Sequence, residues 1–251
     1  MLEFDPQMLL AGLFTGIISG FFGIGGGTVL VPMLIFIGIE IKEAIGISLV
    51  QMTMGSIYGS YLNSKKSLID LGLILPIGFG GFLGALGSIF FVQNVSSQFL
   101  EIMFLVFLFY AIYRVWRGKK SLGDEGEFHK ASRLTLVGIG GMIGFFAISI
   151  GVGGSLLLVP ILVGFFHYDI KKAIATGLFF VIFSSVAGVI SFSFGGEISY
   201  EKGLIVGFAS LFGVQLGIWL GHKTEQELQK KLLLAFYVSI AVYMAYRVFN
   251  F

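Results

Sequence analysis

Two glycine-rich segments contain the residues of this chain that are best suited to hold a small charged molecule. Residues 23–32 read GIGGGTVLVP and residues 151–160 read GVGGSLLLVP, each inside a long apolar stretch. Consecutive glycines break a helix, so each segment leaves unpaired N–H groups where the next helix begins, near Thr28 in the first copy. Helix N-termini carry partial positive charge and bind anions. The pattern predicts one anion held between two helix N-termini, one from each half of the chain.

Neutral polar side chains at membrane depth complete the predicted site. Glycine lets a ligand approach the backbone closely, and an unpaired amide in hydrocarbon is costly. The hydroxyls among these side chains also suit helix packing, and that alternative stays open. The candidate substrate-binding residues are Gly25, Gly26, Gly27, Thr28, Gly153, Gly154, Ser155, Ser48, Gln51, Thr176, Ser185 and Gln215, with Thr53, Ser56 and Ser184 as further polar candidates.

Composition places these residues in a polytopic membrane protein. Hydrophobic residues make up 56% of the chain and charged residues only 12%, about half the share in a soluble domain. A net charge of +2 is too small to indicate nucleic acid as a partner. The chain has no cysteine, which excludes disulfides and thiolate metal sites. We expect no cofactor, and the acidic start MLEFDPQ predicts no cleavable signal peptide.

The chain repeats itself beyond the glycine segments. IKEAIGISL at 41–49 parallels IKKAIATGL at 170–178, and YRVW at 113–116 parallels YRVF at 246–249. Such duplication predicts two copies of one structural unit. The predicted organisation is a first transmembrane repeat over 1–118, a linker over 119–130 and a second transmembrane repeat over 131–251.

Apolar length predicts which segments cross the bilayer, whose core is about 30 Å thick. The arms that flank the first glycine segment, 8–22 and 28–40, are only about 22 and 20 Å long as helices. Pro32 and Pro160 are expected about one turn into their helices, where a missing N–H costs little. The predicted spans are 44–62, 71–92, 99–116, 173–194, 203–221 and 232–249.

Basic residues indicate how the glycine segments enter the membrane. The linker region is rich in Lys and Arg and is therefore expected in the cytoplasm. If each glycine segment returns to the side it came from, 13 basic residues lie inside and 3 outside; if each crosses once, the split is 10 to 6. We therefore favour an all-α fold in which each repeat has a glycine-broken re-entrant hairpin plus three transmembrane helices. The repeats are then inverted, with both termini outside.

The doubled motif resembles the TauE/SafE permeases, a family of sulfite-exporter-like transporters. The two segments fit GxGG[GS]xxLVP, each is followed by an AIGISL-like stretch, and the likeness extends over essentially the whole chain. The chain departs from the pattern at Gly177, where a hydroxyl is common, and at Ile47, where threonine is usual. The resemblance implies transport of sulfite, thiosulfate or organosulfonates, with Gly25 to Gly27 and Gly153 to Ser155 at the site. It also implies a 4+4 helix plan, which differs from the charge count.

The leading functional hypothesis is a secondary transporter in the cytoplasmic membrane that works by alternating access between inverted repeats. Its partners are then a small sulfur oxyanion or sulfonate, the lipid bilayer, and a proton or cation as a possible co-substrate. An anion channel and a carrier of another small organic anion are the alternatives. An enzyme is not expected, because the membrane segments contain no nucleophile with an adjacent base and no His/Asp/Glu cluster.

Overall fold

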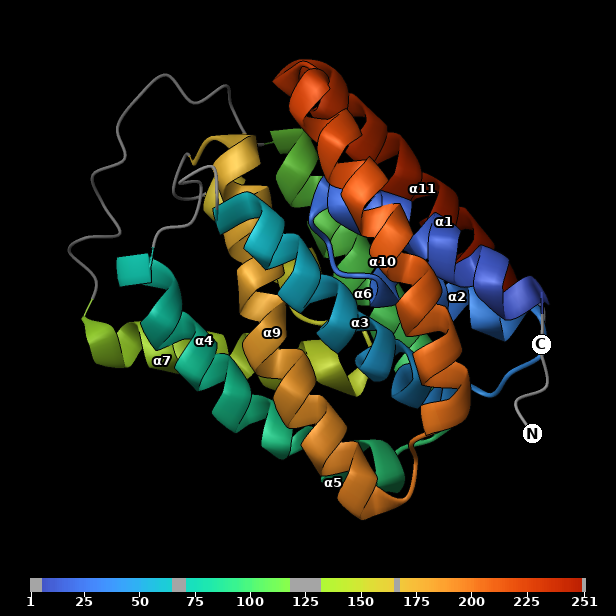
Figure 1. The fold of residues 1–251 in the computed structure, drawn as a ribbon. Helices are drawn as coiled ribbons and strands as arrows, with labels where there is room; N and C mark the ends of the chain where they lie inside the picture. Colours follow the sequence, from blue (N-terminus) through green and yellow to red (C-terminus); the bar gives the residue numbers. More distant parts are fainter. Residues whose placement is uncertain (1–5, 65–70, 118–131, 165–167, 250–251) are drawn as a thin grey trace.

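The computed structural model describes residues 6–64, 71–117, 132–164 and 168–249, and in these residues every regular element is a helix. The predicted linker, 119–130, lies outside the described residues, as do His129 and His167. The helices, shown in Figure 1, are α1 (Pro6–Phe22), α2 (Gly27–Phe36), α3 (Ile41–Ser64), α4 (Leu71–Leu86), α5 (Ser88–Asn94), α6 (Ser97–Arg117), α7 (Arg133–Ser149), α8 (Ser155–Gly164), α9 (Ile170–Gly195), α10 (Tyr200–Lys223) and α11 (Gln226–Phe249).

Helices of matching length follow one another in the two halves. α1 and α7 have 17 residues each, and α2 and α8 have 10 each. The predicted glycine breaks separate them, because left-handed backbone conformations, which only glycine adopts readily, end each first helix. The glycines with positive φ at the two breaks are Gly23, Gly25, Gly151, Gly153 and Gly154.

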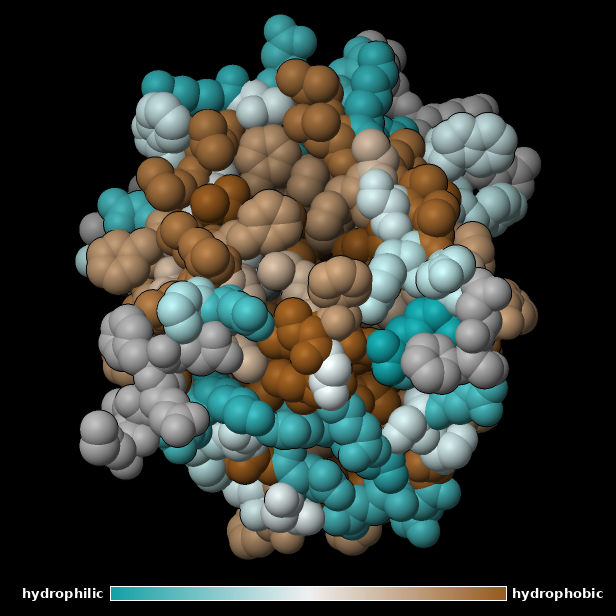
Figure 2. Space-filling view, turned by 90° about the vertical axis from the view of Figure 1, so that its right-hand side faces the viewer, coloured by the Kyte–Doolittle hydropathy of each residue, from teal (hydrophilic) through white to brown (hydrophobic). Residues whose placement is uncertain are grey.

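The fold is that of a polytopic membrane protein. Five helical segments in the described part of the chain are long and apolar enough to cross a bilayer, and they coincide with five of the six predicted spans. The sixth predicted span, 44–62, lies in α3, which is 24 residues long but richer in polar residues. Figure 2 shows apolar residues across the middle of one face, with hydrophilic residues along its top and in a band below. Large exposed side chains such as Phe36, Phe212 and Trp219 suit contact with lipid.

The first glycine break turns the chain back on itself. Gln7 and Leu10 near the start of α1 line one hollow together with Met33 and Ile37 at the end of α2. The Thr15 hydroxyl also points at the Met33 sulfur, at 4.0 Å. α1 and α2 therefore form a helical hairpin whose two outer ends lie on the same side. With 10 residues, α2 is about 15 Å long, which is half of a bilayer core.

Glycine stripes set how closely the outer helices approach. A β-carbon on Gly16 of α1 would overlap the carbonyl oxygen of Ser210 in α10, so the two backbones touch. Gly84 of α4 meets the carbonyl oxygen of Gly141 in α7 in the same way. Glycines at four-residue spacing therefore serve helix packing in these pairs.

α3 and α9 cross near the middle of the molecule (Figure 1). Gly59 of α3 packs against Leu178 of α9, and Gly188 of α9 packs against Leu49 of α3, so the two helices run antiparallel. Both helices are largely buried. They form the rigid support against which the glycine breaks lie.

The prolines lie deeper in their helices than expected. Pro32 and Pro160 are the sixth residues of α2 and α8, so the prediction that they fall where a missing N–H costs little is wrong. In a helix interior, proline removes the donor for the carbonyl four residues earlier. The carbonyl groups of Thr28 and Leu156 therefore lack their helical donors.

Candidate functional site

The two glycine breaks meet each other at the centre of the fold. A β-carbon on Gly27 would overlap the carbonyl oxygen of Gly151, which places the two backbones in direct contact. A β-carbon on Gly25 would lie 3.2 Å from the hydroxyl oxygen of Ser155. The structure thus brings together the two predicted glycine segments, 23–32 and 151–160, which are 128 positions apart in sequence.

Each break opens directly into a helix N-terminus. The carbonyl of Gly26 accepts the N–H groups of Val29 and Leu30, at 3.1 and 2.9 Å, and so starts α2. The carbonyl of Gly154 starts α8 in the same way, by accepting from Leu157 and Leu158. The N-cap residue of α2 is Gly26, which has no side chain to cap the helix. The first N–H groups of such a helix have no acceptor within the helix and are suited to bind an anion.

Three of the polar candidates hold the breaks in shape. The hydroxyl of Ser48 in α3 is shared between the carbonyls of Ile45, at 2.8 Å, and Gly151, at 3.1 Å, and the hydroxyl of Ser184 in α9 donates to the carbonyl of Gly153 at 2.8 Å. Thr28 donates to the carbonyl of Ile24, one turn earlier, at 3.3 Å. Apart from that of Ile45, the backbone carbonyls to which these hydroxyls donate lie in the breaks and so have no N–H donor from a helix.

Four other candidates are fully buried without a hydrogen-bond partner among the described residues: Gln51, Ser155, Thr176 and Ser185. The Gln51 amide lies directly over Gly26, where a β-carbon would overlap its oxygen. Ser155 lies beside Gly25 and is itself the first residue of α8. Buried polar groups in native proteins nearly always have partners, since leaving one unpaired costs about 1–3 kcal/mol. The Gln51 amide and the Ser155 hydroxyl beside two helix N-termini are groups that can hydrogen-bond to a small polar ligand.

The two halves present different side chains to their glycines. Residue 180, 129 positions after Gln51, is phenylalanine, and its ring packs on Gly154 as the amide of Gln51 does on Gly26. The N-terminus of α2 therefore faces an amide, whereas that of α8 faces an aromatic ring. Phe180 was not among the candidate residues, although it occupies the same position in the second repeat as Gln51 does in the first. Gly177 likewise offers no hydroxyl to the nearby Gly23 carbonyl, while its counterpart Ser48 binds the carbonyl of Gly151.

Gln215 lies apart from this group. Its side chain is exposed on α10 and accepts a hydrogen bond of 3.1 Å from the hydroxyl of Tyr58. The structure does not bring it to the glycine breaks.

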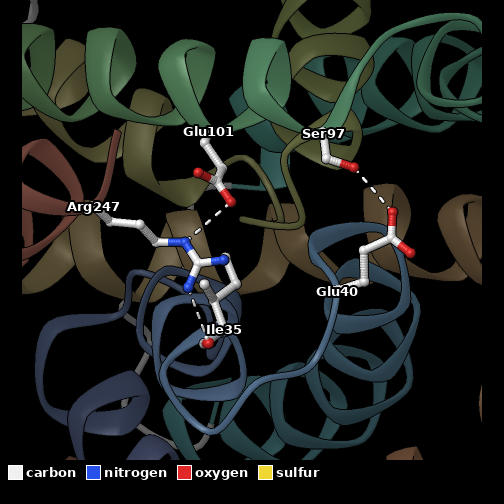
Figure 3. Close-up of polar contacts among 5 residues, drawn as sticks. All are labelled: Ile35, Glu40, Ser97, Glu101 and Arg247. Carbon is white, nitrogen blue, oxygen red and sulfur yellow. Dashed lines mark hydrogen bonds and ion pairs between the residues drawn. The ribbon is translucent and has the colours of Figure 1, made fainter. Parts of the chain in front are cut away.

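The outer end of α2 is fixed by an ion pair, shown in Figure 3. Nε of Arg247 in α11 lies 3.2 Å from Oε1 of Glu101 in α6, and Nη1 donates to the carbonyl of Ile35 in the last turn of α2. Next to this pair, Ser97 donates to Glu40 at 2.9 Å. A cation at the C-terminal end complements the helix dipole and so stabilises α2. The arginine thus orients the half-helix whose other end opens at the glycine break.

Comparison with known proteins identifies the family of the chain. The model of the sulfite exporter TauE/SafE family matches residues 8–244. A probable membrane transporter protein of Methanocaldococcus jannaschii is 26% identical over 250 residues, which cover 88% of this chain and 90% of that protein. The probable membrane transporter protein YunE of Bacillus subtilis is 26% identical over 242 residues, covering 87% and 89%. No solved structure matches significantly. The family model extends from the first hairpin to the last helix, and the chain therefore belongs to the sulfite exporter TauE/SafE family of membrane transporters.

Proposed function

We propose that the protein is a secondary transporter that moves a small sulfur-containing anion, such as sulfite, thiosulfate or an organosulfonate, across the cytoplasmic membrane. One observation carries the proposal: two helix N-termini from different halves meet at unpartnered, fully buried polar side chains. The choice of a sulfur anion is supported by the description of the matching family as sulfite exporters.

The anion binds beside Gly25 and Gly26, at the N-terminus of α2. Its oxygens accept from backbone N–H groups, from the amide nitrogen of Gln51 and from the hydroxyl of Ser155. Each hydrogen bond to a charged group contributes about 1.5–3 kcal/mol, and each helix terminus about 0.3–1 kcal/mol. After desolvation, the remainder suits a dissociation constant between about 1 μM and 1 mM, at which a carrier can still release its cargo.

The two repeats are inverted and give alternating access. The antiparallel crossing of α3 and α9 supports this, because these helices occupy the same place in the two halves. The close contact of α1 with α10 has its counterpart in that of α7 with α4. Inverted repeats commonly place the substrate site at their interface, near the bilayer midplane. In this arrangement the two hairpins reach the centre from opposite faces, the linker is cytoplasmic and the termini lie outside.

A carrier accounts for the central contact better than a channel does. The touching backbones of Gly27 and Gly151 close the route at that point, and a carrier keeps at least one side closed at every stage. Coupling then comes from a proton on the substrate or from a cation held by backbone carbonyls. The carbonyls of Thr28 and Leu156, whose helical donors are replaced by prolines, are suited to the second role.

Counterflow in proteoliposomes tests the proposal. Vesicles containing the purified protein are preloaded with sulfite, thiosulfate, methanesulfonate, sulfate or acetate, and uptake of the same labelled anion is followed. We expect exchange stimulated by internal substrate for a sulfur anion. Flux of many anions without such stimulation identifies a channel, and exchange of acetate alone identifies a carrier of organic anions. If none of these anions is taken up, the proposal that the protein transports small sulfur-containing anions is refuted.

A matched pair of variants connects the flux to the glycine break. Gly26 has an ordinary helical φ of −63°, so Gly26→Ala is tolerated by the backbone, yet its β-carbon displaces the Gln51 amide. We expect this variant to fold and to lose counterflow. Gly138→Ala is the control, since a β-carbon there meets nothing within 4 Å. Normal flux in Gly26→Ala would refute the assignment of the site.

A further inference from the structure

A small polar pocket lies next to the first glycine break, between α1, α3, α9, α10 and α11. Its volume is about 20 Å³, enough for one water molecule. Ile174 lies between the pocket and the break, because its side chain lines the pocket and also meets Gly23 so closely that a β-carbon there would overlap it. The lining residues are Gly20, Phe21, Asn63, Lys171, Ile174, Ile218, Gly221, His222 and Gln229.

The pocket contains a buried acceptor that no described residue satisfies. Gln229 is 2% exposed; its amide nitrogen donates to the carbonyl of Phe21 at 2.6 Å, while its oxygen has no partner in the described part of the chain. Lys171 adds a positive charge at the same pocket, where its Nζ donates to the carbonyl of His222 at 3.1 Å. Asn63 adds an amide that is 3% exposed. A cation beside amide groups suits a hydrated or protonated oxyanion, which both accepts and donates hydrogen bonds.

The equivalent place in the other half keeps the lysine, as Lys42, but has apolar side chains at two other positions. Residue 192, 129 positions after Asn63, is phenylalanine, and residue 92, 129 positions before Gly221, is valine. Both Phe192 and Val92 are fully buried. Ile45, the counterpart of Ile174, contacts Gly151 and is fully buried as well. The two halves therefore share the isoleucine beside the glycine break and the lysine before it, but differ at the position of Asn63, which is Phe192 in the other copy.

We propose that this pocket is the mouth through which a small oxyanion or sulfonate reaches the first glycine break, and that Ile174 packed on Gly23 is its gate. The inference rests on the proposed function, because it concerns the route to the same site. Lys171 attracts the anion and the Asn63 amide donates to it, while the free oxygen of Gln229 accepts from a water molecule that accompanies the anion or from the proton of a protonated oxyanion. Movement of Ile174 off Gly23 then connects the mouth to Gly25 and Gln51.

Cysteine labelling tests the mouth directly, because the chain has no cysteine of its own. Ile174→Cys introduces a single thiol at the gate, and Ile45→Cys is the matched control beside the other glycine break. Each variant reacts with 2-sulfonatoethyl methanethiosulfonate, which carries a small sulfonate, and with the cationic trimethylammonium analogue. We expect the sulfonate reagent to label Ile174→Cys at least about tenfold faster than Ile45→Cys, and faster than the cationic reagent does, because Lys171 favours anions.

Removal of the lysine charge gives the decisive comparison. In the Ile174→Cys background, Lys171→Gln is expected to slow the sulfonate reagent about fivefold and to leave an uncharged methyl reagent unchanged. Equal labelling rates in the two cysteine variants would refute the proposal that the pocket is the entrance for the anion. So would a preference for the sulfonate reagent that Lys171→Gln leaves unchanged. If Ile174→Cys fails to fold, Asn63→Cys reads the same pocket.

The labelling and the transport assay fail in different ways. If labelling depends on the charge of the reagent but no counterflow is detected, sulfur-anion transport is refuted and the pocket as an entrance is supported. If a sulfur anion shows counterflow but Ile174→Cys and Asn63→Cys do not react, transport is supported and the pocket as an entrance is refuted.

Discussion

Substitution of Gly27 by alanine is the most direct test of the contact between the two glycine breaks. The new β-carbon would overlap the carbonyl oxygen of Gly151 and lie 2.9 Å from the sulfur of Met52. A backbone carbonyl cannot rotate away as a side chain can, so the two breaks must separate. Overpacking of this kind costs about 1–3 kcal/mol. In a chain of this size that corresponds to a fall in Tm of about 2–12 °C.

Thermal unfolding of the detergent-solubilised protein measures this effect, and Gly26→Ala provides the contrast. At Gly26 the atoms nearest to the new β-carbon are those at the end of the Gln51 side chain, so Gln51→Ala should restore the Tm of Gly26→Ala. The same second substitution should leave Gly27→Ala destabilised, since Gln51 is not what its β-carbon meets. The difference between the two double-mutant cycles isolates the backbone contact. A Gly27→Ala protein with the Tm and counterflow of the original chain would refute the reasoning.

Three further predictions concern single positions. Gln51→Leu should raise the unfolding free energy by about 1–3 kcal/mol, because it removes an unpartnered buried amide, and should abolish counterflow; full transport activity would show that Gln51 does not bind the cargo. Arg247→Gln leaves the Glu101 carboxylate unpaired at a side-chain exposure of 12%, and should cost about 1.5–3 kcal/mol. The double variant with Glu101→Gln should recover part of that loss of Tm, and a purely additive result would rule out coupling between the two. Gly138→Ala should stabilise α7 by about 0.5–1 kcal/mol, because its β-carbon enters open space; a lower Tm would indicate that another molecule covers this face.

The helices and their breaks could be predicted from the sequence because local rules determine them. Runs of about 20 apolar residues set the spans, and adjacent glycines set the breaks. The helix expected near Thr28 begins at Gly27, and the break at Gly153 and Gly154 ends where α8 starts at Ser155. These features depend on residues within a few positions of one another.

The side chains that face the breaks could not be predicted in the same way, because the packing of distant helices determines them. Gln51 and Gln215 are both amides on long apolar helices, yet one lies over Gly26 and the other is exposed and binds Tyr58. The residues around Gln51 and Gln215 in the sequence do not indicate which side of each helix faces the centre of the fold. Phe180 was missed because a phenylalanine in a membrane helix is usually assigned to lipid or to packing.

The backbone contact between Gly27 and Gly151 has a mechanical consequence. Side chains between two moving parts can change rotamer and so accommodate a small displacement. Two backbones in direct contact cannot do this. A displacement of the first hairpin is therefore passed to the second without delay. Under the proposed alternating access, closing on one side and opening on the other would then be a single event, with no interval in which solutes leak through both sides.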